Sequence, residues 1–172
     1  MTNLDQLKDR IPDHARDLRI NLGVIGSSTA LSPAQAWTIA LASAVMTKQR
    51  DLIAAVEADA ATHLEAPALA SAKGAAAVMG MNNVYYRFVH FMGDGSEYGH
   101  MPARLRMQII GNPGIDKLDF ELACLAASAI SGCESCVRSH EKAVRERGGT
   151  KEQVQDAVRI AAALNGAAVA LS

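Results

Sequence analysis

Apolar residues recur at helical spacing through most of the chain, with helix start and stop signals between them. Residues 93–116 break this pattern, because they combine glycines and prolines with only a short apolar run. We therefore expect an all-α fold with one long connection, which includes a helical piece around 105–110. The helices are expected over about 31–48, 51–62, 67–91, 117–130, 133–146 and 150–171, with a short one over 3–10 before Pro12.

Two of these helices begin with a capping box. Ser32 precedes Pro33 and Gln35, and Thr150 stands three residues before Gln153. In such a box the side chains of the first and fourth residues each accept a hydrogen bond from the other's backbone N–H. Proline suits the first helical position, where its missing N–H costs nothing.

Composition limits which residues can form the core and which kinds of partner the protein can bind. Hydrophobic residues make up 49% of the 172 residues but aromatic ones only 4%, so the core must consist of aliphatic side chains and alanine. With 17 basic and 18 acidic residues, the chain lacks the basic surface of a nucleic-acid binder. No apolar run reaches the roughly 18–20 residues of a membrane span. The first residues also lack the apolar segment of a secretory signal, so we expect a cytoplasmic protein.

Two pairs of segments are similar at nearly equal offsets. ALASAV at 40–45 resembles LAASAI at 125–130, and AAVMG at 76–80 resembles AALNG at 162–166. This indicates two copies of one helical unit in a single domain over 1–172. A degenerate half would cover about 30–92, and the half over about 115–172 would carry all the cysteines.

The three cysteines are too few for a disulfide scaffold, and their number is odd. In a reducing compartment, such a chain uses cysteine for reactivity or for metal binding. Cys124 lies in the apolar stretch ELACLAAS and is predicted to be a buried core residue.

Cys133 and Cys136 stand at the expected start of a helix, in SGCESCVRSHEK. Unpaired N–H groups there stabilise a thiolate, which is the reactive form of cysteine. Cysteines three residues apart share a helix face and can form a disulfide. His140 lies one turn beyond Cys136 on that face, where it can take or return a proton. Helix-start electrostatics alone favours Cys133 as the stronger thiolate.

This spacing leaves two other interpretations open. Cys133, Cys136 and His140 could bind zinc with a fourth ligand from elsewhere, although structural zinc sites usually include a second paired cluster, and none is visible. Such a chain would be a metal-binding or redox-sensing module without peroxidase turnover. Alternatively, the cysteines could be inert.

Other residues with chemical potential show no partner pattern. Glu121 is interpreted as a carboxylate in the first turn of its helix. Spacing alone cannot show whether it lies near the cysteines. We expect surface or packing roles for the remaining histidines, and core or interface roles for three aromatic residues. These are His14, His63, His90 and His100, and Tyr85, Tyr86 and Phe88.

Three segments together resemble the alkyl hydroperoxidase D (AhpD) family, and the resemblance covers nearly the whole chain. They are GAAAVMGMNNVYYRF, NPGIDKLDFELACLAASAISGC and the Cys-x-x-Cys-x-x-x-His run. The resemblance implies a helical fold of the carboxymuconolactone-decarboxylase type, assembled as a homotrimer. It also implies alkyl hydroperoxide reduction and electron transfer to the peroxiredoxin AhpC. The electrons would come from dihydrolipoamide on a lipoyl-bearing dehydrogenase-complex acyltransferase, without a bound cofactor.

The family's catalytic pattern matches Glu121, Cys133, Cys136 and His140. By this resemblance, Cys136 attacks the peroxide and becomes a sulfenic acid, and Cys133 is the proton donor and disulfide partner. A relay of Glu121, water and His140 activates Cys136. This order reverses the one that helix-start electrostatics favours. Close family members carry an auxiliary histidine immediately before the second cysteine, where this chain has Ser135.

Overall fold

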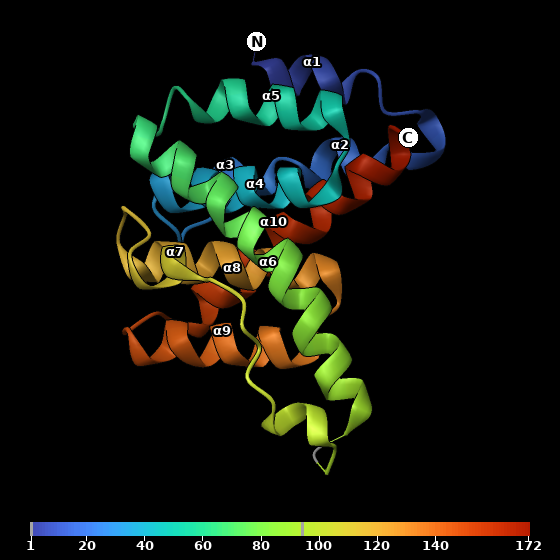
Figure 1. Cartoon of the computed structure of the whole chain (residues 1–172). Helices are drawn as coiled ribbons and strands as arrows, with labels where there is room; N and C mark the ends of the chain where they lie inside the picture. Colours follow the sequence, from blue (N-terminus) through green and yellow to red (C-terminus); the bar gives the residue numbers. More distant parts are fainter. Residues whose placement is uncertain (1, 94) are drawn as a thin grey trace.

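The computed structural model describes residues 2–93 and 95–172, and within these ranges it contains helices but no strand (Figure 1). The predicted all-α fold is thereby confirmed. The six longer helices are α4 (Pro33–Thr47), α5 (Arg50–Ala60), α6 (Ala66–Met92), α8 (Lys117–Ser131), α9 (Glu134–Glu146) and α10 (Lys151–Ala170). The short elements are α1 (Asn3–Lys8), η1 (Asp13–Ala15), α2 (Asp17–Asn21), α3 (Val24–Ser27), η2 (Glu97–His100) and α7 (Gln108–Gly111).

The capping residues set the helix starts as expected. Ser32 and Thr150 each make both bonds of a capping box, with Gln35 and Gln153. The helical piece predicted at 105–110 lies slightly later in the chain, because the single turn of α7 begins only at Gln108. The short elements η1, α2, α3 and η2 were not predicted, since three to five residues leave no periodic pattern to detect.

The core lies around α4 and α8, which pack against each other and against both α6 and α10. Most of its side chains are alanine or aliphatic, as the composition predicted. Phe120 is the only aromatic residue among the fully buried large side chains of the described part of the chain. Small side chains allow helices to approach closely, so α8 is held firmly where it leads into the cysteines.

The two predicted halves contain helices of matching length and ending. α4 and α8 each span fifteen residues, and each ends at a residue with left-handed backbone, Lys48 (φ 62°) or Gly132 (φ 68°). The next residue, Gln49 or Cys133, is the N-cap of the following helix. The internal duplication itself stays a prediction.

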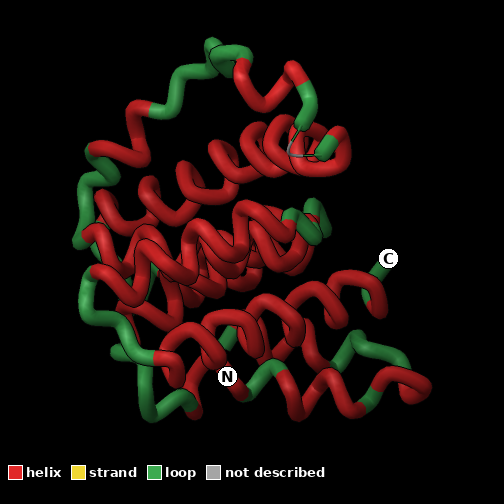
Figure 2. The backbone as a smooth tube through the Cα atoms, turned by 90° about the horizontal axis from the view of Figure 1, so that it is seen from below, coloured by secondary structure: helices red, strands yellow, loops and turns green. Residues whose placement is uncertain are grey.

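α6 is the longest helix, and its C-terminal part extends beyond the bundle (Figure 1). The chain returns through η2 and α7 as a mostly non-helical arch over one side of the bundle (Figure 2). None of the helices in 2–93 and 95–172 combines the length and the hydrophobicity needed to cross a membrane.

Asp59, near the end of α5, anchors the N-terminal helix. Its buried carboxylate accepts hydrogen bonds from the backbone N–H groups of Asn3 (2.9 Å) and Leu4 (2.8 Å) and from the Asn3 amide (2.7 Å). Asp59→Ala leaves these donors without that partner, so the free energy of unfolding should fall by about 1–3 kcal/mol. Urea denaturation measures this loss, and hydrogen exchange should show lost protection in α1.

The matched control is Asp51→Ala on the same helix. Asp51 forms a half-exposed ion pair with Arg10 (2.6 Å), and such pairs contribute only about 0–1 kcal/mol. Equal losses in the two variants would contradict an anchoring role for Asp59.

Candidate active site

A tight turn between α8 and α9 positions the two cysteines. Gly132 has positive φ there, which glycine adopts without strain, and the Cys133 N–H donates to the Ser128 carbonyl (3.2 Å). Beyond the far end of α9, a Cβ on Gly149 would lie 2.9 Å from Leu118 at the start of α8. The two helices therefore run antiparallel, and side chains distant in sequence face each other across the pair.

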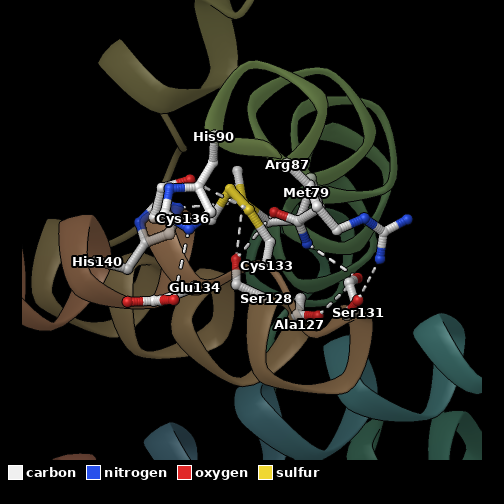
Figure 3. The surroundings of a disulfide bond; sticks show 12 residues. Met79, Arg87, His90, Ala127, Ser128, Ser131, Cys133, Glu134, Cys136 and His140 are labelled. Carbon is white, nitrogen blue, oxygen red and sulfur yellow. Dashed lines mark hydrogen bonds and ion pairs between the residues drawn. A yellow bond between two sulfur atoms is a disulfide. The ribbon is translucent and has the colours of Figure 1, made fainter. Parts of the chain in front are cut away.

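Cys133 and Cys136 form a disulfide at this turn, with their Cα atoms 5.3 Å apart (Figure 3). Cys133 is the N-cap of α9 and is fully buried, whereas Cys136 is 6% exposed and lines a cavity. A small molecule that enters this cavity therefore meets the sulfur of Cys136.

The antiparallel pair brings Glu121 of α8 to His140 of α9. The Glu121 Oε2 atom lies 2.7 Å from Nδ1 of His140, and both side chains are largely buried, with exposed fractions of 8% and 12%. When the carboxylate is ionised it only accepts hydrogen bonds, and Nδ1–H of His140 is then the donor in this pair. The structure thus places Glu121 beside His140, which the sequence alone could not do.

The second ring nitrogen of His140 faces α6. Its Nε2 atom lies 3.1 Å from the sulfur of Met79, which is fully buried and also lies 3.4 Å from the Ser128 hydroxyl. Within the described residues, His140 makes no direct hydrogen bond to either cysteine sulfur. Sequence reasoning missed Met79, because nothing in its apolar surroundings distinguishes it from a core methionine.

α6 also fixes the end of α8, immediately before the cysteines (Figure 3). The Asn83 amide donates to the Ser131 hydroxyl (2.9 Å), and its oxygen lies 3.1 Å from the hydroxyl of Ser128, which donates. The Arg87 guanidinium donates to the Ser131 carbonyl (2.7 Å). These bonds satisfy polar groups at the helix end and hold the turn against α6.

A charged cluster surrounds the outer side of the disulfide. Glu134 pairs with Arg138 (2.9 Å) and lies 3.5 Å from His90 (Figure 3). The His90 side chain is 43% exposed and so lies at the surface, as expected. Ser135, at the position of the family's auxiliary histidine, has its hydroxyl 3.6 Å from the Cys133 sulfur. It can provide a hydrogen bond there, but not the proton transfer of an imidazole.

The cavity beside Cys136 has a volume of about 420 Å³. Tyr86, predicted to be a core or interface residue, forms part of its wall. Its lining comes from α6, α7, α8, α9 and the residue before α7: Met79, Asn82, Tyr86, Met107, Ile110, Glu121, Ser135, Cys136, Ser139, His140 and Ala143. A larger cavity of about 630 Å³ lies between α2, α3 and α10 and contains none of the predicted site residues.

The zinc interpretation requires Cys133, Cys136 and His140 as a ligand set. In this form the two sulfurs are bonded to each other, and both nitrogens of His140 contact other side chains. Across 2–93 and 95–172, no three His, Cys, Asp or Glu side chains are arranged to hold a metal ion. The observed geometry is that of a dithiol–disulfide pair next to a buried acid–base pair.

Comparison with known proteins places this geometry in a family. The family model for carboxymuconolactone decarboxylase matches residues 96–172. The full-length relatives of this chain include three proteins with the name alkyl hydroperoxide reductase AhpD. The protein of Rhodospirillum centenum is 49% identical over 98% of this chain and 90% of its own length. That of Gluconacetobacter diazotrophicus is 52% identical (98% and 92%), and that of Maricaulis maris 49% (99% and 98%).

The chain belongs to the AhpD family. This confirms the family that the sequence motifs indicated. The carboxymuconolactone decarboxylase match includes Glu121, both disulfide cysteines and His140. The α6 residues that line the cavity precede the region that the family model matches. They lie within the 98% of the chain over which the AhpD relatives are similar.

Cys124 is fully buried and lies outside the disulfide, which confirms its predicted core position. Burial raises the pKa of its thiol well above the usual value, and the Glu121 carboxylate raises this pKa further. We therefore expect iodoacetamide to label no cysteine of the native oxidised protein at neutral pH. Mass spectrometry should find one label in denaturant and three in denaturant with reductant.

The Cys124→Ala variant provides the control for this experiment. It should take up no label in denaturant without reductant. Labelling of Cys124 in the native wild-type protein would contradict the buried position.

Proposed function

We propose that this protein reduces alkyl hydroperoxides with the dithiol of Cys133 and Cys136, which is converted to the disulfide in each turnover. One observation carries the proposal: the disulfide presents Cys136 to a cavity that it shares with the Glu121–His140 pair. A dithiol, a buried proton acceptor and room for a substrate are the three requirements of this chemistry.

In the first step, the thiol proton of Cys136 passes through a water molecule to the relay of His140 and Glu121. The thiolate then donates an electron pair to the terminal oxygen of the hydroperoxide, so that an S–O bond forms and the O–O bond breaks. Cys136 becomes a sulfenic acid. The alkoxide leaves with the other electron pair and takes the proton of the Cys133 thiol, which gives the alcohol.

In the second step, the thiolate of Cys133 attacks the sulfur of Cys136. The S–S bond forms, and the hydroxide that leaves takes the proton held by the relay and becomes water. Two thiols and one hydroperoxide thus yield a disulfide, an alcohol and water. The 5.3 Å separation of the Cα atoms lies within the range that a disulfide requires.

Two observations support Cys136 as the attacking residue. It is the sulfur that lines the cavity, whereas Cys133 is fully buried. Cys136 is also the third residue of α9, within the first turn, where backbone N–H groups lack partners in the helix. The start of α9 can therefore stabilise a thiolate at Cys136 as well as at Cys133.

We further propose that dihydrolipoamide on a lipoyl-bearing acyltransferase reduces the disulfide, and that the protein passes electrons to AhpC as a cytoplasmic homotrimer. The resemblance supports this pathway, and the apolar part of the cavity wall suits an aliphatic arm. A dithiol donor also suits the site, because its second thiol can release the mixed disulfide on Cys136.

Reduction of the oxidised protein by different donors tests the pathway. Dihydrolipoamide should reduce the disulfide at least about tenfold faster than glutathione or thioredoxin at equal thiol concentration, because only the small dithiol both enters the cavity and completes the exchange. The appearance of free thiols measures the rate. An equal or faster rate with glutathione or thioredoxin would exclude dihydrolipoamide as the preferred donor.

A further inference from the structure

Asn82 of α6 is a buried polar residue in the wall of the cavity. Its side chain is only 5% exposed, and its Oδ1 atom has no hydrogen-bond partner among the residues that the structure describes. The neighbouring Asn83 differs, because its amide is bonded to Ser128 and Ser131. Asn83 therefore has a structural role, whereas the Asn82 acceptor is not used by the fold.

A buried acceptor without a partner destabilises a protein, so such a group calls for a partner from outside the chain, either a bound water or a ligand. Asn82 follows Met79 by three residues and precedes Tyr86 by four, and all three line the cavity. This spacing places them on one face of α6. Since Met79 contacts His140, the amide lies on the helix face that meets the proton relay.

We propose that the side-chain amide of Asn82 turns toward the cavity and positions the hydroperoxide by accepting a hydrogen bond from its terminal O–H group at Oδ1. The inference rests on the proposed function and adds a substrate-binding residue to it. The alkyl group of the substrate packs against the apolar wall formed by Met79, Tyr86 and Ile110. The terminal oxygen is then held beside Cys136, which opens into the same cavity.

This hydrogen bond is compatible with the chemistry at every stage. The hydrogen of the terminal oxygen does not move when the O–O bond breaks, because it stays on the oxygen that becomes the sulfenic hydroxyl group. Asn82 therefore contacts the same O–H group before and after the S–O bond forms. The carboxamide neither gains nor loses a proton near neutral pH, so it does not compete with His140 for the thiol proton.

The test compares Asn82→Leu with the wild type in stopped-flow oxidation of the reduced protein by tert-butyl hydroperoxide. Leucine has a similar size but no acceptor, so the second-order rate constant should fall about three- to tenfold, as for the loss of one ordinary hydrogen bond. The thermal midpoint should not fall, because an unpartnered polar group is removed. Reduction of the disulfide by dithiothreitol should keep its wild-type rate.

The chain offers a matched control in Ser71, another buried residue of α6 whose hydroxyl is unpartnered in the described structure. Ser71 does not line the cavity, so Ser71→Ala should keep the wild-type oxidation rate. Asn82→Gln retains the carboxamide and should recover part of the rate. Asn82→Ala repeats the measurement if leucine prevents folding.

The outcomes separate this inference from the proposed function. A wild-type protein that does not react with tert-butyl hydroperoxide refutes both. If the wild type reacts and Asn82→Leu reacts equally fast, only the role of Asn82 is refuted. Equal slowing of peroxide oxidation and dithiothreitol reduction, or a glutamine variant as slow as the leucine variant, would likewise overturn the hydrogen bond to the substrate.

Discussion

Replacement of Cys136 by serine should abolish peroxide reduction, with a rate loss on the order of 10³-fold or more, because it removes the nucleophile. Cys133→Ser should behave differently. Its Cys136 thiol still faces the cavity and can react once with the hydroperoxide. The reaction then stops at the sulfenic acid, since the partner that closes the disulfide is missing.

Mass spectrometry after dimedone trapping distinguishes the two variants. Reduced Cys133→Ser exposed to tert-butyl hydroperoxide should carry one adduct at Cys136 and consume one equivalent of peroxide. Cys124→Ala should turn over like the wild type, because that thiol is buried and takes no part in the disulfide. An adduct at Cys133 in the Cys136→Ser protein would reverse the order of the two thiols and restore the order that helix-start electrostatics favoured.

The second large effect concerns the buried pair of Glu121 and His140. Glu121→Gln and His140→Gln should each slow oxidation of the reduced protein by about 10²-fold, at the lower end of the range for general acid–base groups. Glutamine at 121 keeps the shape of the side chain but removes the charge that orients and supports the imidazole. The double variant should be no slower than the slower single variant, because the two groups act as one unit.

Stopped-flow measurement of all three variants gives the coupling between the two residues. Glu146→Gln is the matched control, since it removes a carboxylate at the exposed end of α9, where Glu146 lies 3.7 Å from Lys142. Its oxidation rate should equal that of the wild type. Losses that simply multiply in the double variant would show that Glu121 and His140 act independently, contrary to the relay.

What the sequence could predict depended on how local each interaction is. The capping boxes at Ser32 and Thr150 involve residues three apart, so the sequence alone predicted where these two helices start. Cys133, Cys136 and His140 likewise lie within one short segment. Glu121 came only from the family resemblance, because its contact with His140 depends on a reversal of direction at Gly132.

The contribution of α6 could not be predicted at all. Met79 and Asn82 lie more than forty residues before the cysteines, and they reach the site only because α6 packs against α8 and α9. Their sequence segment is apolar and helical, as is most of the core. Tyr86 illustrates the same limit, since an aromatic residue at helical spacing looks identical whether it faces a core or a cavity.

The disulfide encloses only the two residues between its cysteines. The stabilisation that a cross-link gives a protein, by restricting its unfolded chain, grows with the length of the loop it closes. A loop this short restricts the unfolded chain little, and both cysteines belong to the same turn and helix start. In the proposed cycle, opening and closing this bond should therefore leave the molecule folded, because its alanine-rich core does not depend on the cross-link.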